Sequence, residues 1–358
     1  MPSPFPSTSS HPGHGEIHLT LLPPALPTFS TLTYTYPLKL LPSTPHILAP
    51  HPQTSNESNA SPNGSNTVTL AHTSPTPIQP TFVPLLFLLT YGGGVISGDH
   101  IALIIHLDPS TRLTTTTQGS TKIFKPPPNI SSSKPPTTRQ DLTVHIAPHA
   151  ALWLAPDPVQ PFAGSLYAQT QRFEVEREGN LGVVDWVCEG RRARGESWGF
   201  EGWRGRNEVW DVYGKDGEGK ERRMLVRDAV VLEGRDIRGR MDGKGVFGTV
   251  ILRGPLFKGL ADFFVEEFKT LPRIGGRNWG SGNEVVKELT KEEEWRKRRL
   301  EREKEDGVLW TACHVRGCAI VKFAASEVEG ARWWLGCMLR EEGSVGREFG
   351  DGGLMFVR

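Results

Sequence analysis

Glycine and proline occur frequently along the whole chain. The 358 residues include 39 glycines and 29 prolines. Proline breaks the interior of an α-helix and glycine weakens it, whereas both residues are common in tight turns. Their frequency argues against a helical bundle. It favours a mostly β protein in which many short strands are joined by tight turns.

Short runs with strand character recur between these turns. Ile17, Leu19 and Leu21 alternate with other residues, as do Leu142, Val144 and Ile146. Such alternation is typical of a strand with one buried face. The same style predicts strands in residues 31–41, 101–107, 113–117, 122–124, 173–177 and 246–252. Residues 202–222 are rich in glycine and charge, and we expect them to form a loop and an edge strand.

Two helices are expected near the C-terminus. The first covers residues 284–305 and consists almost entirely of lysine, arginine and glutamate, so its i,i+4 pairs predict an exposed helix. The second begins near Ser326, a good N-cap, and ends before Gly343. Its apolar residues fall on one face, which predicts packing against the sheet.

Three segments interrupt the pattern of packed strands. Residues 1–14 read as a disordered tail, and residues 50–80 and 126–137 as disordered insertions with few large apolar side chains. A charged helical insertion is expected at residues 284–306. The remainder of residues 15–358 is interpreted as a single domain.

Composition excludes several classes of protein. The net charge of +1 offers no overall field for nucleic acid or a membrane. The longest apolar run, Phe82 to Leu89, contains Pro84 and is too short to span a bilayer. Residues 1–14 lack a basic region followed by an apolar one, and the four cysteines are scattered, so we expect a reducing, cytoplasmic location.

The most informative segment is the glycine-rich run from Leu89 to Asp99. A phosphate-binding P-loop would end in Gly-Lys-Ser/Thr, but this run ends in Ser97-Gly98-Asp99. A dinucleotide fingerprint would lead into a helix, but residues 101–107 read as a strand. We therefore interpret the segment as a sharp turn between strands, with positive φ at one or more glycines.

This turn and the segment that follows it resemble the UreD (UreH) family of urease accessory proteins. In that family a GGGxxxGD turn precedes a strand and a TTQGATKVY-like element, which corresponds here to Leu113 to Phe124. Residues 153–162 resemble the family's PDPxIPF element, residues 189–196 its GRxxxGE element, and residues 16–43 its N-terminal opening. The matches depart from the family at Ser97, where many members have glycine, and at Trp153, where glutamate is common.

The resemblance implies a fold, a function and partners. The fold would be an irregular, β-helical stack of sheets with a few α-helices. The protein would not be an enzyme; it would act as a scaffold and nickel conduit in urease metallocentre assembly, bridging apo-urease to UreF and the GTPase UreG. It would carry no cofactor of its own, with nickel only in transit, and it would be able to pair as a homodimer within the complex.

Four carboxylates are candidates for a nickel path, since oxygen ligands with water suit a transiently held divalent ion. They are Asp99, Asp157, Glu189 and Glu196. The alternative for Asp99 and Asp157 is the capping of turns, and for Glu196 a pair with Arg191 or Arg194. The remaining residues of the motifs are assigned structural roles: Gly92, Gly93, Gly94, Gly98, Thr117, Gln118, Gly119, Lys122, Pro156, Pro158, Gly190 and Arg191.

Cysteine and histidine offer a second set of metal ligands. Cys313, His314 and Cys318 lie close in sequence, but their spacing is not that of a paired zinc site. On a strand, Cys313 and His314 would point to opposite faces, so buried structural thiols are the alternative. His11, His14 and His18 are read as incidental histidines, and no tightly bound metal is expected.

Rival functions belong to other classes. A small-molecule enzyme would use the glycine-rich turn as an active-site loop, but the sequence shows neither a Gly-x-Ser-x-Gly elbow nor a His-Glu-x-x-His pair. A nickel-storage protein would use histidine and cysteine to bind the metal tightly. A degenerate copy of the accessory protein is the third alternative.

Overall fold

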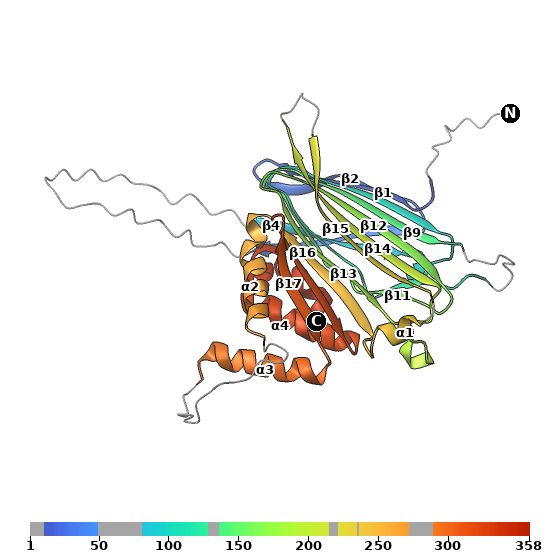
Figure 1. The fold of residues 1–358 in the computed structure, drawn as a ribbon. Coiled ribbons are helices and arrows are strands. Elements are labelled where there is room, and N and C mark those ends of the chain that lie inside the picture. Colours follow the sequence, from blue (N-terminus) through green and yellow to red (C-terminus); the bar gives the residue numbers. More distant parts are fainter. Residues whose placement is uncertain (1–10, 49–80, 128–135, 215–220, 235, 272–288) are drawn as a thin grey trace, which may run out of the picture.

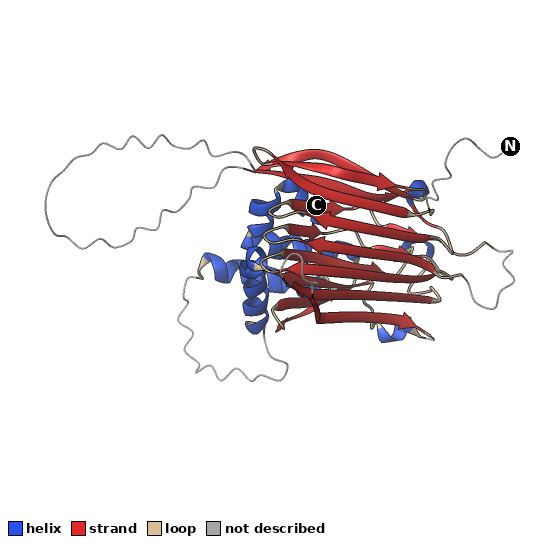
Figure 2. Ribbon diagram, turned by 90° about the horizontal axis from the view of Figure 1, so that it is seen from above, coloured by secondary structure: helices blue, strands red, loops and turns tan. Residues whose placement is uncertain are grey.

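The computed structural model consists of two stacked β-sheets and a layer of helices (Figures 1 and 2). The structure describes residues 11–48, 81–127, 136–214, 221–234, 236–271 and 289–358. The expected insertion at residues 50–80 lies outside these ranges, as do most of the insertion at 126–137 and residues 1–10 of the expected tail. Within that tail, His14 already begins a strand.

The first sheet has seven strands. Their spatial order is β15 (Glu221–Glu233), β14 (Gly202–Tyr213), β12 (Leu166–Glu176), β9 (Thr138–Ile146), β6 (His100–Leu107), β1 (His14–Leu22) and β2 (Leu26–Tyr34). β1, β6, β9, β12 and β14 run parallel to one another, and β2 and β15 close the two edges as antiparallel strands.

The second sheet lies beneath the first. Its main path is β17 (Leu309–Val315), β18 (Cys318–Ala325), β16 (Val246–Arg253), β13 (Asn180–Cys188), β10 (Ala151–Leu154), β7 (Arg112–Thr116), β4 (Thr81–Thr90) and β3 (Leu38–Leu48). Three short strands extend it beside this path: β5 (Gly94–Val95), β8 (Thr121–Ile123) and β11 (Val159–Pro161).

The chain winds between the two sheets as a coil. β6, β9 and β12 lie side by side in the first sheet, while the strands that follow them, β7, β10 and β13, lie side by side in the second. Neighbours from successive turns of the coil pair in parallel. The expected mostly β, β-helical stack of sheets is therefore confirmed.

Each sheet buries its apolar side chains according to its position. In β6, Ile101, Leu103, Ile105 and Leu107 point inward, and the residues between them face outward. The second sheet is covered on both faces, so every residue of β13 is buried. Continuous burial of this kind is typical of parallel strands between two layers.

Helices cover the far face of the second sheet (Figure 1). They are α2 (Lys258–Lys269), α3 (Lys291–Glu305), α4 (Val328–Glu342) and α5 (Ser344–Phe349). The short helix α1 (Ile237–Arg240) lies apart from this layer, and its Ile237 packs into the core between the sheets (Figure 1). 3₁₀ turns lie at Tyr91–Gly93, Arg192–Arg194, Pro255–Phe257 and Asp351–Val357. α4 buries Trp334, Leu335 and Met338 as its expected apolar face, although Glu327 rather than Ser326 occupies its N-cap. No helix among the described residues is both long and apolar enough to cross a membrane.

Trp153 of β10 lies in the apolar core between the second sheet and the helices. Its ring packs against Phe257, Phe349 and Phe356, and its indole N–H donates to the carbonyl of Gly353 at 2.8 Å. Trp153 joins the second sheet to the C-terminal helices.

One expectation about a charged segment was wrong, and a second was only partly right. Residues 202–213 form β14, an interior strand paired on both sides, because Gly205, Asn207 and Val209 point inward between charged residues. The alternation was hidden because two of these inward residues are not apolar. The charged helix α3 is not simply exposed, since Arg299 is completely buried and pairs with Glu267 of α2.

Candidate functional site between the two sheets

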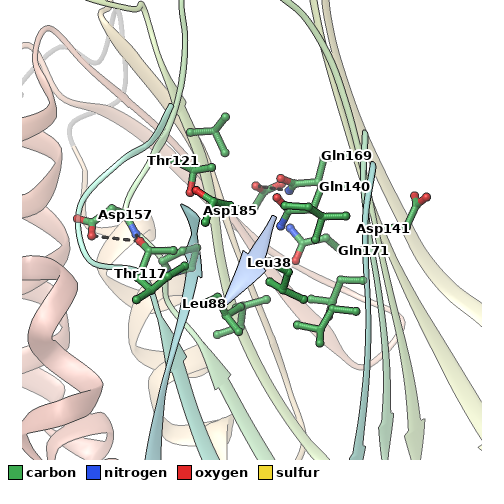
Figure 3. Close-up of a pocket in the computed structure, with 18 of the residues that line it drawn as sticks. Leu38, Leu88, Thr117, Thr121, Gln140, Asp141, Asp157, Gln169, Gln171 and Asp185 are labelled. Atoms are coloured by element: carbon green, nitrogen blue, oxygen red, sulfur yellow. Dashed lines mark hydrogen bonds between the residues drawn. The ribbon is translucent and has the colours of Figure 1, made fainter. Parts of the chain in front are cut away.

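A cavity of about 70 Å³ lies between the two sheets (Figure 3). Its wall is apolar on one side, where Leu38, Leu88 and Leu103 contribute. The polar part of the wall consists of Thr117, Thr121, Gln140, Asp157, Gln169, Gln171 and Asp185, whereas the half-exposed side chain of Asp141 points away from the cavity (Figure 3). A group of carboxylate and amide side chains deep inside a protein calls for a chemical explanation, because burying polar groups is costly.

Asp185 is one of two buried carboxylates of this group, the other being Asp157. It lies in the middle of β13, and its two oxygens accept hydrogen bonds from Gln169 Nε2 at 2.9 Å and from Asn207 Nδ2 at 2.7 Å. Burial raises the pKa of Asp185 above its usual value, although these two hydrogen bonds act in the opposite direction. Both donors are neutral amides, so Asp185 is placed to receive a proton or a cation.

The network extends from Asp185 across the first sheet. The hydroxyl of Tyr167 donates toward two amide oxygens, Gln140 Oε1 and Gln169 Oε1, each of which lies 3.1 Å away. Adjacent parallel strands bring these residues together, because Gln169 of β12 pairs in register with Gln140 of β9. Sequence reasoning missed this group. The available signal was a single aspartate inside the otherwise apolar run from Leu181 to Cys188.

Asp157 lines another part of the cavity wall. Its Oδ2 accepts hydrogen bonds from Thr117 Oγ1 at 3.2 Å and from the backbone N–H of Gly119 at 2.8 Å. Its Oδ1 pairs with Arg332 of α4, which also donates to the carbonyl of Phe356 at 3.0 Å. Asp157 therefore links the Thr117–Gly119 turn to the C-terminal helices, in agreement with a turn-capping role. Pro156 lines the same cavity, and Pro158 is buried beside it.

The glycine-rich turn lies elsewhere. Asp99 Oδ2 accepts a hydrogen bond from the backbone N–H of Ile96 at 3.0 Å, so Asp99 caps its own turn and does not line the cavity. Gly92, Gly93 and Gly98 adopt positive φ, as interpreted from the sequence. Gly94 pairs with Lys122, and a Cβ there would lie 2.5 Å from the Lys122 carbonyl. Of the adjoining residues, Gln118 and Lys122 are exposed.

Glu189 and Glu196 also lie outside the inter-sheet cavity. Glu196 pairs with Arg191, whose Nε is 2.9 Å from Glu196 Oε1, and this hydrogen bond lowers the pKa of Glu196. Gly190, which follows Glu189 in the chain, has a φ of 103°. Glu189 lies 3.7 Å from Arg192 in a surface groove. Of the four candidate carboxylates, the structure therefore brings only Asp157 to the inter-sheet cavity.

The cysteine and histidine candidates do not converge. Cys313 is exposed on β17, whereas Cys318 is buried on β18. His314 is exposed and lies 3.3 Å from Asp262 of α2. Within the described ranges, no three histidine, cysteine, aspartate or glutamate side chains are placed to hold a metal ion.

Comparison with known proteins assigns the chain to a family. The model of the UreD urease accessory proteins matches residues 57–347. Urease accessory protein 4 of Cryptococcus neoformans is 28% identical, covering 90% of this chain and 88% of its own. A ureD-like protein of Schizosaccharomyces pombe, described as an uncharacterized urease accessory protein, is 29% identical over 70% of this chain and 79% of its own. Urease accessory protein D of Arabidopsis thaliana is 34% identical over 53% of this chain and 61% of its own. This chain belongs to the UreD family of urease accessory proteins.

Proposed function

We propose that this protein is a non-catalytic scaffold that conducts nickel during assembly of the urease metallocentre. It holds apo-urease beside UreF and the GTPase UreG in the cytoplasm, in a complex that accommodates paired copies of the chain. Family membership supports the role in urease maturation. The partners and the nickel cargo go beyond what family membership supports.

The observation that carries the conduit is the polar cavity between the sheets. Its wall presents the carboxylate of Asp185 and the amides of Gln140, Gln169 and Gln171, and Asp157 lies at its edge with its carboxylate turned toward Arg332 (Figure 3). Nickel accepts oxygen ligands together with water. A cavity of about 70 Å³ has room for several water molecules, so an ion there retains part of its hydration. These ligands suit an ion that is held briefly and released.

Proton exchange at Asp185 would make this passage depend on pH. Because burial raises the pKa of Asp185, its protonated form persists to higher pH than that of an exposed aspartate. A divalent cation must displace this proton to bind the carboxylate. We therefore expect nickel transfer to weaken as the pH falls toward the pKa of Asp185.

The test uses a strain of the source organism that lacks this gene. Urease activity is measured at ordinary and at excess nickel after complementation with wild type, Asp185→Asn, Asp157→Asn or the matched control Asp99→Asn. We expect several-fold lower activity for Asp185→Asn at ordinary nickel and partial recovery at excess nickel. UreF and UreG should still co-purify with this variant, and Asp99→Asn, whose side chain lies outside the cavity, should behave like wild type.

Three results would contradict the proposal. Full urease activity of an Asp157→Asn/Asp185→Asn double variant at limiting nickel would show that nickel does not pass through the cavity. Unchanged urease activity in the deletion strain would favour a degenerate copy. Stoichiometric, tight nickel binding by the isolated chain would favour a storage protein.

A further inference from the structure

Asp185 is the inner end of a row of polar side chains that crosses the second sheet. Asp185 of β13 is the cross-strand neighbour of Thr249 of β16, and Thr249 is the cross-strand neighbour of Lys322 of β18. The side chains of directly opposed residues lie on the same face of a sheet. This face meets the first sheet, because it also carries Ile251 and Ile320 of the core between the sheets. The row therefore runs between the two sheets.

A second polar row lies opposite it in the first sheet. Gln171 of β12 is the direct neighbour of Asn207 of β14, and Asn207 is the direct neighbour of Asp228 of β15. Two hydrogen bonds join the rows. Asn207 Nδ2 donates to Asp185 Oδ2 at 2.7 Å. Thr249 Oγ1 donates to Asp228 Oδ2 at 3.1 Å. Because Gln171 and Asp185 also line the inter-sheet cavity (Figure 3), the rows form one polar line from the cavity to β15, an edge strand of the first sheet.

The line contains a polar atom that has no partner among the residues that the structure describes. Asn207 is only 2% exposed, and its Oδ1 accepts no hydrogen bond from these residues. The Asp185 carboxylate fixes the orientation of this amide, since an ionised carboxylate accepts hydrogen bonds and therefore takes the Nδ2 side. A buried acceptor without a donor costs free energy. Its place beside a carboxylate suits a water molecule or a hydrated cation better than it suits sealed packing.

Lys322 closes the outer end of the line. Its Nζ forms an ion pair with Asp228 and lies 3.1 Å from Thr249 Oγ1. The side chain of Lys322 is 29% exposed and that of Asp228 is 14% exposed, so the ammonium group lies where the line meets solvent. It occupies the oxygen atoms that a cation would contact on leaving, and its positive charge repels such a cation. The flexible four-carbon stem of lysine allows the ammonium group to turn outward.

The charges along the line explain why Lys322 stays in place when no ion is passing. Burial is the main cause that raises the pKa of Asp185; among the neighbouring charges, Asp228 adds to this effect and Lys322 opposes it. One ammonium group therefore stabilises two carboxylates that repel each other. A divalent cation that reaches Asp185 supplies the balancing charge itself and repels the ammonium group toward solvent.

We propose that Lys322 gates the passage. Its ammonium group, held by Asp228 and Thr249, closes the outer end of the polar line and turns outward when a divalent cation reaches Asp185. The inference rests on the proposed function, since the gate acts on the same nickel passage. It adds the route beyond the cavity and the residue that controls it. The alternative is an ion pair that only stabilises the edge of the stack.

The test is the initial rate at which purified apo-urease is activated by this protein together with UreF, UreG, GTP and limiting Ni²⁺. Lys322→Met/Asp228→Asn removes the ion pair without leaving an unpaired buried charge. The matched control is Arg253→Met/Asp211→Asn. Arg253 is also a cation of the second sheet in an ion pair, with a side chain 15% exposed, but its neighbour in β13 is the apolar Leu181. We expect at least threefold faster activation for the first double variant and the wild-type rate for the control.

A cysteine at the gate separates the effect of its charge from any effect on the fold. Lys322→Cys is made in a Cys313→Ser background, which removes the exposed thiol. Aminoethyl methanethiosulfonate then restores an ammonium group at this position, whereas methyl methanethiosulfonate adds a neutral group. We expect fast activation with the methyl label and the wild-type rate with the aminoethyl label.

Two results would overturn the gate. One is an equal activation rate for the two labelled forms, and the other is a rate at or below wild type for Lys322→Met/Asp228→Asn. The outcome for the passage itself is read separately from Asp185→Asn. Lower activity of Asp185→Asn together with unchanged rates in the gate variants would refute the gate and leave the passage, whereas full activity of Asp185→Asn would count against both.

Discussion

Arg299 connects the charged helix α3 to the rest of the protein, and its removal gives a sharp test of that connection. The side chain is completely buried. Its guanidinium lies 2.9 Å from Glu267 Oε2 and 2.6 Å from Glu303 Oε1, and it packs over the rings of Trp295 and Trp310. We predict that Arg299→Met destabilises the protein substantially, because a buried ion pair loses one partner.

The two carboxylates respond differently to this change. Glu267 keeps Arg296, whose nitrogens lie 2.6 Å and 3.0 Å from its oxygens. Glu303 keeps only the indole N–H donors of Trp310 and Trp334, at 3.2 Å and 3.0 Å, among the contacts that the structure shows for it. The cost of the substitution therefore falls mainly on Glu303, which becomes a buried carboxylate without a cation in contact.

Protonation of Glu303 limits that cost. Breaking a buried pair typically costs about 3–5 kcal/mol. Neutralising a carboxyl group of ordinary pKa at pH 7 costs about 3.7 kcal/mol, and burial already raises the pKa of Glu303. We therefore expect a loss of about 3 kcal/mol in the free energy of unfolding at pH 7. The double variant Arg299→Met/Glu303→Gln should recover to within about 1 kcal/mol of wild type, since no unpaired charge remains.

The pH dependence has a definite sign. A carboxyl group whose pKa is raised in the folded state contributes its stability at low pH and loses it as the pH rises through that pKa. The deficit of Arg299→Met should therefore shrink on acidification. The assay is guanidinium denaturation followed by tryptophan fluorescence at several pH values. Arg302→Met is the matched control, because Arg302 of the same helix is half exposed, and its loss should cost at most about 1 kcal/mol. A loss below 1 kcal/mol for Arg299→Met, or no recovery in the double variant, would refute the reasoning.

Three further predictions follow from packing and burial. Gly182→Ala should lower the free energy of unfolding by about 1–3 kcal/mol, because the added Cβ would lie 2.4 Å from the ring of Trp153; denaturation matching wild type would show that this contact is not tight. Gly92→Ala should cost about 1–2 kcal/mol through its φ of 79° alone, since no described residue other than its chain neighbours lies within 4 Å of the new Cβ. A crystal structure of the variant should show the turn unchanged. In the native protein, iodoacetamide should modify the exposed Cys313 and spare Cys188. Burial shields Cys188 and raises the pKa of its thiol to about 11. Rapid labelling of Cys188, detected by mass spectrometry, would contradict its burial.

Local patterns in the sequence predicted much of the secondary structure. The alternation at Ile17 and Leu19 indicated β1, and the alternation at Leu142 and Val144 indicated β9. The positive φ of Gly92, Gly93 and Gly98 follows from a glycine-rich turn. These features depend only on residues that are close together in the chain, so they can be predicted without knowing the fold.

Two features of the predicted elements were missed because they depend on partners that are distant in sequence. β14 is an interior strand although its sequence is rich in charge, since β12 and β15 satisfy its backbone on both sides. α3 is anchored by Arg299, whose buried position depends on Glu267 of another helix. Neither feature leaves a periodic signal in its own segment.

The sequence alone determined that the chain is mostly β, where its glycine turns lie and which family motifs it carries. The tertiary structure decided which polar residues meet. Asp185 joins Gln169 and Asn207 inside the stack, and His18, His106 and His145 form one row outside it. The physical reason is that strand alternation sets only the face on which a side chain lies. The register between successive turns of the coil, which depends on the packing of the whole stack, sets its neighbours.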